Sequence, residues 1–204
     1  MVLGVTGGIA TGKSSVAAML GECGAVVVSA DDLARQAVAP GSDALAALVE
    51  RFGRGILFAD GALDRERLAR LVFADPVARA ELNRITHPAI ARLAEERLAQ
   101  LRAAGHPLIV YEAPLLFEAG AESRVDQVLV VCTAPDIQQQ RLMQRDTLSA
   151  EDAQTRIATQ MPLTEKIRRA DYLIDNSGTL AEARLQVAEL CKELLHINSH
   201  GTPP

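Results

Sequence analysis

The sequence predicts an α/β protein whose core is a five-stranded parallel sheet covered by helices on both faces. Two observations point to this class. Five short apolar or β-branched runs occur at residues 2–6, 25–29, 108–112, 127–132 and 172–175. Each run is followed by a glycine-rich turn, an acidic or proline-containing loop, or a helical pattern, which is typical of βαβ units.

The composition is that of an ordinary globular protein. Of the 204 residues, 49% are hydrophobic and 23% are charged, which excludes the disordered and collagen-like classes. The net charge of −5 argues against general binding to nucleic acid, and no apolar run approaches the ~20 residues that span a bilayer. Cys23, Cys132 and Cys191 are too far apart to suggest a disulfide framework or a zinc site. We expect a cytoplasmic protein, since no basic leader precedes the first strand, and a monomer by default.

The segment between the second and third runs is longer than one crossover needs. Residues 31–106 have helical patterns throughout, and we expect them to form a helical subdomain inserted between residues 1–30 and 107–195 of the core. The pair His87-Pro88 interrupts the last of these patterns, and we expect a kink or a break there. Residues 136–170 are also helical but locally basic, either as a solvated surface or as a lid. Residues 196–204 are expected to be a flexible tail.

The first run is followed by Gly7-Gly8-Ile9-Ala10-Thr11-Gly12-Lys13-Ser14, which fits the phosphate-loop pattern G-x-x-x-x-G-K-[ST]. Between a strand and a helix, such a loop turns backbone N–H groups toward phosphate oxygens, and the helix N-terminus adds its dipole. Lys13 neutralises the β- and γ-phosphates, and the Ser14 hydroxyl is a ligand for Mg²⁺. We therefore expect a nucleoside triphosphate to be bound by Gly8, Ile9, Ala10, Thr11, Gly12, Lys13, Ser14 and Ser15.

Two features favour transfer of the γ-phosphoryl group to a second substrate over hydrolysis. The run 108–112 ends in Glu112 instead of the usual Asp, and the Asn-Lys-x-Asp segment that reads guanine is absent. Asp31 follows the second run, at the edge where open α/β sheets bind ligands. Its carboxylate could take the proton of an acceptor hydroxyl, or Ser29 and Asp31 could cap the next helix. The residues alone do not separate these two roles.

Three later features each have a functional and a structural interpretation. Arg141 and Arg145 share one helical face, where they could bind phosphate as part of a lid or lie exposed to solvent. His87 could touch an acceptor or only end a helix. The apolar stretch 114–117 is either a wall for an acceptor or a packed turn.

The order and spacing of these segments resemble a known family, the dephospho-CoA kinases, along nearly the whole chain up to about residue 195. Any one of the later segments is a weak signal, whereas their order and spacing together are specific. The matching segments are Thr6-Gly7-Gly8-Ile9 with Gly12-Lys13-Ser14, Ala30-Asp31 with Ala34-Arg35, His87-Pro88, Pro114-Leu115-Leu116-Phe117-Glu118, Gln139 with Arg141-Leu142 and Arg145-Asp146, Arg156 with Gln160, and Ala170-Asp171 with Asp175-Asn176-Ser177-Gly178.

The resemblance implies a P-loop kinase that uses ATP and Mg²⁺ to phosphorylate the ribose 3′-hydroxyl of 3′-dephospho-CoA, the last step of coenzyme A biosynthesis. It implies a five-stranded parallel core, a helical CoA-binding insertion after the second strand, and a lid. By this resemblance Asp31 is the catalytic carboxylate, Lys13 and Arg141 are catalytic cations, and Arg145 binds ATP from the lid. Asn176 and Gly178 would contact adenine. The acceptor surface would include Asp31, Arg35, His87, Pro114, Leu115, Leu116 and Phe117.

This sequence departs from the family pattern at two positions, and two rival functions stay open. Ser29 replaces the first acid of the family's Asp-Ala-Asp, and Glu112 stands where an Asp is common. The longer side chain of Glu112 could still reach a metal through water. One rival is another P-loop small-molecule kinase, such as a nucleoside monophosphate or sugar-acid kinase, and the other is a nucleotide-dependent switch. The long insertion and the apolar stretch 114–117 suit a long, pantetheine-bearing acceptor better than a compact one.

Overall fold

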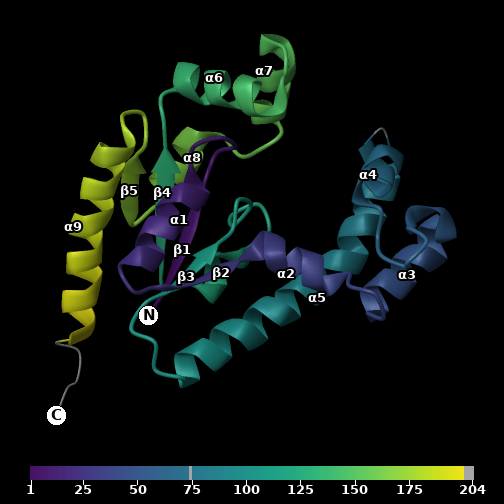
Figure 1. Ribbon diagram of the computed structural model, residues 1–204, viewed down its shortest axis with the longest axis horizontal. Helices are drawn as coiled ribbons and strands as arrows, with labels where there is room; N and C mark the ends of the chain where they lie inside the picture. The colour runs from purple at the N-terminus through teal and green to yellow at the C-terminus, as the bar shows by residue number, and fades with distance from the viewer. Residues whose placement is uncertain (74, 200–204) are drawn as a thin grey trace. The chain divides into compact units, whose positions relative to one another are not determined.

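The structure is a computed structural model that describes residues 1–73 and 75–199. The chain divides into two compact units (Figure 1). The first unit contains Met1–Ser29 and Leu98–Pro204, and the second contains Ala30–Arg97. Each unit has a hydrophobic core of its own.

The first unit is built on a five-stranded sheet, as predicted. Its strands are β1 (Val2–Gly7), β2 (Val26–Ser29), β3 (Ile109–Glu112), β4 (Gln127–Cys132) and β5 (Tyr172–Asp175). They pair in the order β2-β3-β1-β4-β5, and every pairing is parallel. The predicted α/β class with a parallel sheet is therefore confirmed. The strand ends that lead into loops and helices share one edge, where Ser29 and Val5 both pair in register with Glu112.

Helices from both halves of the chain cover this sheet. Helices α1 (Lys13–Glu22) and α9 (Leu180–Ser199) pack together on it, with Leu20 and Leu194 fully buried in the core. Helices α6 (Pro135–Asp146), α7 (Ala150–Ala158) and α8 (Leu163–Arg168) lie between β4 and β5 in the sequence, and η2 (Ala121–Arg124) precedes β4. No helix of the described part of the chain is long and apolar enough to cross a membrane.

The described elements of the second unit are helices, with one isolated antiparallel bridge between Leu57 and Leu63. The unit contains α2 (Ala30–Ala37), α3 (Asp43–Phe52), η1 (Arg54–Ile56), α4 (Arg65–Phe73) and most of α5 (Pro76–Ala103). Ser42 caps α3 by accepting a hydrogen bond from the Leu45 N–H, and Gly53 ends the helix with φ of 82°. Leu48 and Ile56 are fully buried and form the centre of the core.

Two sequence-based expectations differ from the structure. We expected a kink or break at His87-Pro88, but α5 continues through Pro88 as one helix of 28 residues, so the break was wrong. Proline removes one intrahelical hydrogen bond, and the many Ala, Leu, Glu and Arg residues of this helix favour its continuation. The flexible tail expected over residues 196–204 is wrong for residues 196–199, which continue α9, and residues 200–204 lie outside the described part.

Candidate functional site

The loop between β1 and α1 has the conformation that its glycines predict. Ala10 and Gly12 both have positive φ, of 61° and 89°. Gly7 is the last residue of β1, and a Cβ added there would collide with the carbonyl of Val131. The loop is therefore tightly curled, and it leads directly into the N-terminus of α1, where the helix dipole and backbone N–H groups favour a bound anion.

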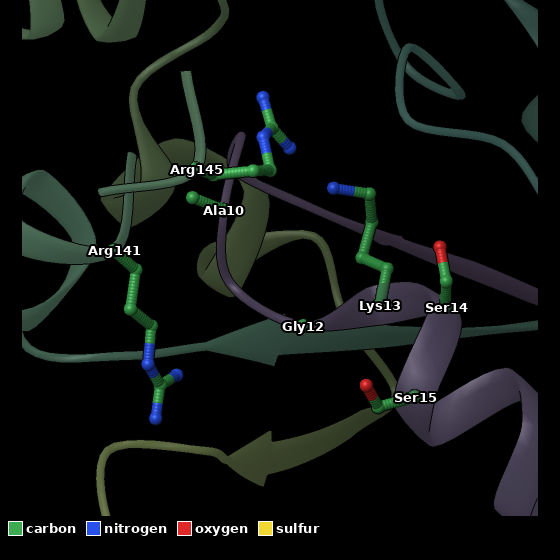
Figure 2. A pocket seen from close by; sticks show the side chains of 7 residues that line it. All are labelled: Ala10, Gly12, Lys13, Ser14, Ser15, Arg141 and Arg145. Carbon is green, nitrogen blue, oxygen red and sulfur yellow. The ribbon is translucent and has the colours of Figure 1, made fainter. Parts of the chain in front are cut away.

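The curled loop forms one side of a pocket of about 300 Å³. The helix α6 supplies the other side with two arginines (Figure 2). The structure thus brings together two segments that lie more than 120 residues apart. The lining residues, all of them among the predicted site residues, are Ala10, Gly12, Lys13, Ser14, Ser15, Arg141 and Arg145.

Lys13 and Ser14 both make polar contacts at the start of α1. Lys13 is 8% exposed, and its Nζ donates a hydrogen bond to the carbonyl of Gly8 at 2.7 Å. The hydroxyl of Ser14 donates to Oε1 of Glu112 at 2.6 Å. Glu112 therefore reaches the phosphate loop from the end of β3, although its side chain replaces the Asp that is common there.

The oxygens of Ser14 and Glu112 are suitable ligands for a Mg²⁺ ion, which prefers hard oxygen donors. Within residues 1–73 and 75–199, no group of three or more His, Cys, Asp and Glu side chains could hold a metal by itself. A cation at this place would take its other ligands from phosphate and water, as Mg²⁺ commonly does at nucleotides.

The two predicted lid arginines have different partners and point in different directions (Figure 2). Nη1 of Arg141 donates to the carbonyl of Asn176 at 2.8 Å. Arg145 forms a bidentate pair with Asp146, at 2.7 and 3.0 Å, and Arg156 from α7 contacts the same carboxylate at 2.5 Å. The hydrogen bond from Arg145 lowers the pKa of Asp146, and the charges of both arginines add to this against the effect of burial. Asp146 thus holds Arg145 and connects α6 to α7.

The residues predicted to contact adenine lie just after β5, and neither lines the pocket. Asn176 is 9% exposed, and its Nδ2 donates to the carbonyl of Thr11 at 2.8 Å. A Cβ on Gly12 would collide with this amide, so Gly12 is needed for packing as well as for its positive φ. Gly178 is exposed and lies against Glu182, which caps α9 together with Thr179.

The stretch 114–117 follows β3 in the first unit. Leu116 and Phe117 are buried and pack as a structural turn would, whereas Leu115 is 48% exposed. The carbonyl of Pro114 accepts hydrogen bonds from Thr6 Oγ1 at 3.2 Å and from Lys166 Nζ at 2.9 Å. The turn is thereby fixed to β1 and to α8.

The remaining predicted residues belong to the second unit. Asp31 is exposed and lies inside the first turn of α2, which begins at Ala30, so it does not occupy the N-cap position. Arg35 forms an exposed ion pair with Asp32 at 2.5 Å. His87 is exposed on α5, one residue before Pro88.

Sequence reasoning missed two polar residues around the site, Gln138 and Lys166, and gave Gln160 only as part of the family resemblance, without a contact. Gln138 and Gln160 both hydrogen bond to the main chain of Ile9, from 129 and 151 residues away. Lys166 is fully buried and pairs with Glu118. No local pattern predicts these contacts, because each one joins segments that are distant in the sequence.

Comparisons with known proteins agree with this geometry. The family model described as dephospho-CoA kinase matches residues 1–182. A dephospho-CoA kinase of Syntrophotalea carbinolica is 55% identical over 195 residues, which cover 96% of this chain and 92% of that protein. Two solved structures are also similar. One is TT1252 from Thermus thermophilus, with 35% identity, a TM-score of 0.78, and coverage of 100% of this chain and 98% of that one.

The other solved structure is a dephospho-CoA kinase from Campylobacter jejuni. It is 30% identical to this chain, with a TM-score of 0.76 and coverage of 97% of this chain and 98% of that one. The family match spans the phosphate loop, the pocket arginines and the second unit. This chain therefore belongs to the dephospho-CoA kinase family.

Proposed function

We propose that this chain transfers the γ-phosphoryl group of ATP to the ribose 3′-hydroxyl of 3′-dephospho-CoA, giving coenzyme A and ADP. The observation that carries the proposal is the pocket in which the phosphate loop faces two arginines, in a chain that matches the dephospho-CoA kinase family over residues 1–182. This family match argues against a nucleotide-dependent switch, because a switch hydrolyses its nucleotide and needs no acceptor.

In the transfer, the bond between the γ-phosphorus and the bridging oxygen of ADP breaks as a bond to the acceptor oxygen forms. Charge develops on the phosphoryl oxygens, and the positive groups around the pocket stabilise it. Lys13 could fill this role, because its ammonium donates a hydrogen bond to the Gly8 carbonyl and could donate to a phosphate oxygen instead. Arg141 and Arg145 would supply the remaining positive charge from α6.

Ser14 and Glu112 are the residues that would hold Mg²⁺, with Ser14 as the direct ligand and Glu112 as its hydrogen-bond partner. When bound, the ion neutralises phosphate charge and helps to orient the β- and γ-phosphates. The position of Glu112 supports this role, because it ends the strand adjacent to β1.

Asp31 is our candidate for the group that takes the proton of the acceptor hydroxyl. It follows β2 by two residues, and the last residue of β2, Ser29, pairs in register with Glu112. This short connection supports the proposed role, because Glu112 contacts the Ser14 hydroxyl. The acceptor itself would be bound by the second unit, including Arg35 and His87, and by the exposed side chain of Leu115.

The cytoplasmic location, the monomeric state and the contact of Asn176 and Gly178 with adenine stay predictions from the sequence. The contact of Asn176 with Thr11 supports a different role for its side chain, which is to hold the phosphate loop.

The role of Asp31 is tested by Asp31→Asn, with Asp32→Asn as the matched control on the same helical turn. We expect Asp31→Asn to lower kcat at least about 100-fold, because a positioned general base typically contributes 10²–10⁴-fold. The Kd for ATP should change little, and Asp32→Asn should retain kcat within about threefold. A loss of less than threefold in kcat for Asp31→Asn would remove Asp31 from this role.

A further inference from the structure

Ile9, in the middle of the phosphate loop, is held on both sides by side-chain amides. Nε2 of Gln138 donates to the carbonyl of Ile9 at 2.8 Å. The N–H of Ile9 donates to Oε1 of Gln160, also at 2.8 Å. A backbone carbonyl needs a donor and a backbone N–H needs an acceptor, so the two glutamines have opposite chemical roles at the same residue.

Gln138 connects the loop to the basic face of α6. It is 5% exposed and lies three residues before Arg141 and seven before Arg145. Residues with this spacing share one face of a helix, so the face that carries both pocket arginines is the face that contacts Ile9. The hydrogen bond from Gln138 therefore fixes the place of these arginines against the loop.

The close approach of Gln138 also explains why residue 8 is a glycine. Gly8 has no positive φ that would require glycine, but a Cβ at this position would lie 2.5 Å from Nε2 of Gln138. The amide can approach the loop this closely because residue 8 has no side chain. The glycine and the glutamine form one structural feature.

Gln160 makes the second contact, from the far end of the predicted lid helices α6 and α7. It lies between α7 and α8, after the segment that Asp146 and Arg156 hold together. The lid helices α6 and α7 are thus attached to the phosphate loop at both ends, and both attachments are to Ile9. A shift of the lid would consequently change the hydrogen bonds of this single residue.

We propose that Gln138 and Gln160 are positioning residues that hold the phosphate loop in its nucleotide-binding conformation and keep Arg141 and Arg145 beside it. Toward Ile9, Gln138 is the donor and Gln160 is the acceptor. With the Ile9 carbonyl directed at Gln138, the phosphates meet N–H groups of the loop rather than this carbonyl oxygen. This proposal rests on the proposed use of the loop to bind ATP.

The same substitution at the two positions tests the proposal. Gln160→Glu keeps an acceptor for the Ile9 N–H, whereas Gln138→Glu replaces the donor with a carboxylate that faces the Ile9 carbonyl. Both variants add one negative charge near the loop, so each controls for the charge of the other. Gln138→Leu and Gln160→Leu remove the contacts without adding charge.

The first readout is the Kd for ADP, measured by calorimetry on the full chain, because it does not depend on the acceptor. We expect Gln138→Glu to raise this Kd at least about tenfold more than Gln160→Glu does, as follows when one partner of a buried hydrogen bond is lost. We expect each leucine variant to raise it about 3- to 10-fold. In steady-state kinetics the KM for ATP should rise, while the KM for the acceptor stays within about twofold.

Equal Kd values for the two glutamate variants would contradict the proposal, as would an unchanged Kd in both leucine variants. Melting curves identify a variant that does not fold, and the leucine variants then decide. If wild type binds ADP but does not phosphorylate 3′-dephospho-CoA, the proposed function fails and the two glutamines can still be judged from the ADP affinities. If wild type does not bind ADP, both proposals fail.

Discussion

The two halves of the Glu118–Lys166 ion pair should contribute unequally to stability. Lys166 is fully buried in α8, and its Nζ contacts a Glu118 carboxylate oxygen at 2.9 Å. The Glu118 side chain is 23% exposed and also accepts a hydrogen bond from the N–H of Met161 at 3.0 Å. Removing Glu118 therefore leaves a charge without access to water, whereas removing Lys166 leaves one that water can reach.

The magnitudes follow from this difference in burial. In Glu118→Ala the ammonium of Lys166 keeps its hydrogen bond to the Pro114 carbonyl but loses its counter-ion. Uncompensated buried charges cost about 3–5 kcal/mol. Lys166→Met fills the same space with an apolar chain, and Pro114 keeps its hydrogen bond from Thr6. We expect this variant to lose about 1 kcal/mol. In a chain of this length 1 kcal/mol corresponds to about 2–4 °C in Tm.

Urea unfolding followed by circular dichroism at matched protein concentration measures both losses. The prediction is that Glu118→Ala loses at least about 2 kcal/mol more than Lys166→Met. The double variant should be no less stable than Glu118→Ala alone, because it no longer contains the buried charge. The reasoning would be refuted by a Lys166→Met variant that is as unstable as Glu118→Ala or less stable.

Three further predictions concern pH, a helix end and the metal site. Burial raises the pKa of Glu118, but hydrogen bonds from Lys166 and Met161 outweigh burial and lower the pKa below 4.5. The stability difference between wild type and Lys166→Met should thus be fully present above pH 4.5 and shrink as the pH falls through the lowered pKa. Urea unfolding from pH 3 to 7 measures this difference, and a difference that grew at acidic pH would contradict the prediction. Thr147 ends α6 with a strained φ of 54°, so Thr147→Gly should raise Tm by about 2–4 °C. Thr159 ends α7 with an ordinary φ of −74°, so Thr159→Gly should lower Tm. Tm changes of the same sign in both variants would refute the strain argument. Ser14→Ala should lower kcat at least about tenfold and raise the Mg²⁺ concentration needed for half-maximal rate, while Ser14→Thr should retain most of the activity; Mg²⁺ titrations that coincide for all three proteins would exclude Ser14 as a ligand.

The sheet could be predicted from the sequence nearly to the residue, for a simple physical reason. Strands of a parallel sheet are buried on both faces and form continuous apolar runs, such as residues 127–132. The phosphate loop was equally accessible, because its conformation is encoded by glycines within eight residues. Both features depend on local sequence.

One of the less predictable features is local, and the others depend on contacts between distant segments. Helix α5 passes through Pro88 although proline alone indicates a break, because a long run of helix-forming residues surrounds it. The contacts of Gln138 and Gln160 with Ile9 had no counterpart in the sequence patterns. The contact of Asn176 with adenine stays a prediction, and no sequence pattern indicated the hydrogen bond that its side chain donates to Thr11. A polar residue in a sequence pattern predicts that a site is present more readily than it predicts which atom the side chain contacts.

The most direct test of the proposed function is the release of ADP from Mg·ATP in a coupled assay, with 3′-dephospho-CoA, with AMP, or without an acceptor. We predict that ADP release depends on 3′-dephospho-CoA and that mass spectrometry finds a product heavier by one phosphate. Stimulation by AMP alone would show a nucleotide kinase instead. Equal ADP release without any acceptor would contradict the proposed transfer and indicate a hydrolytic switch.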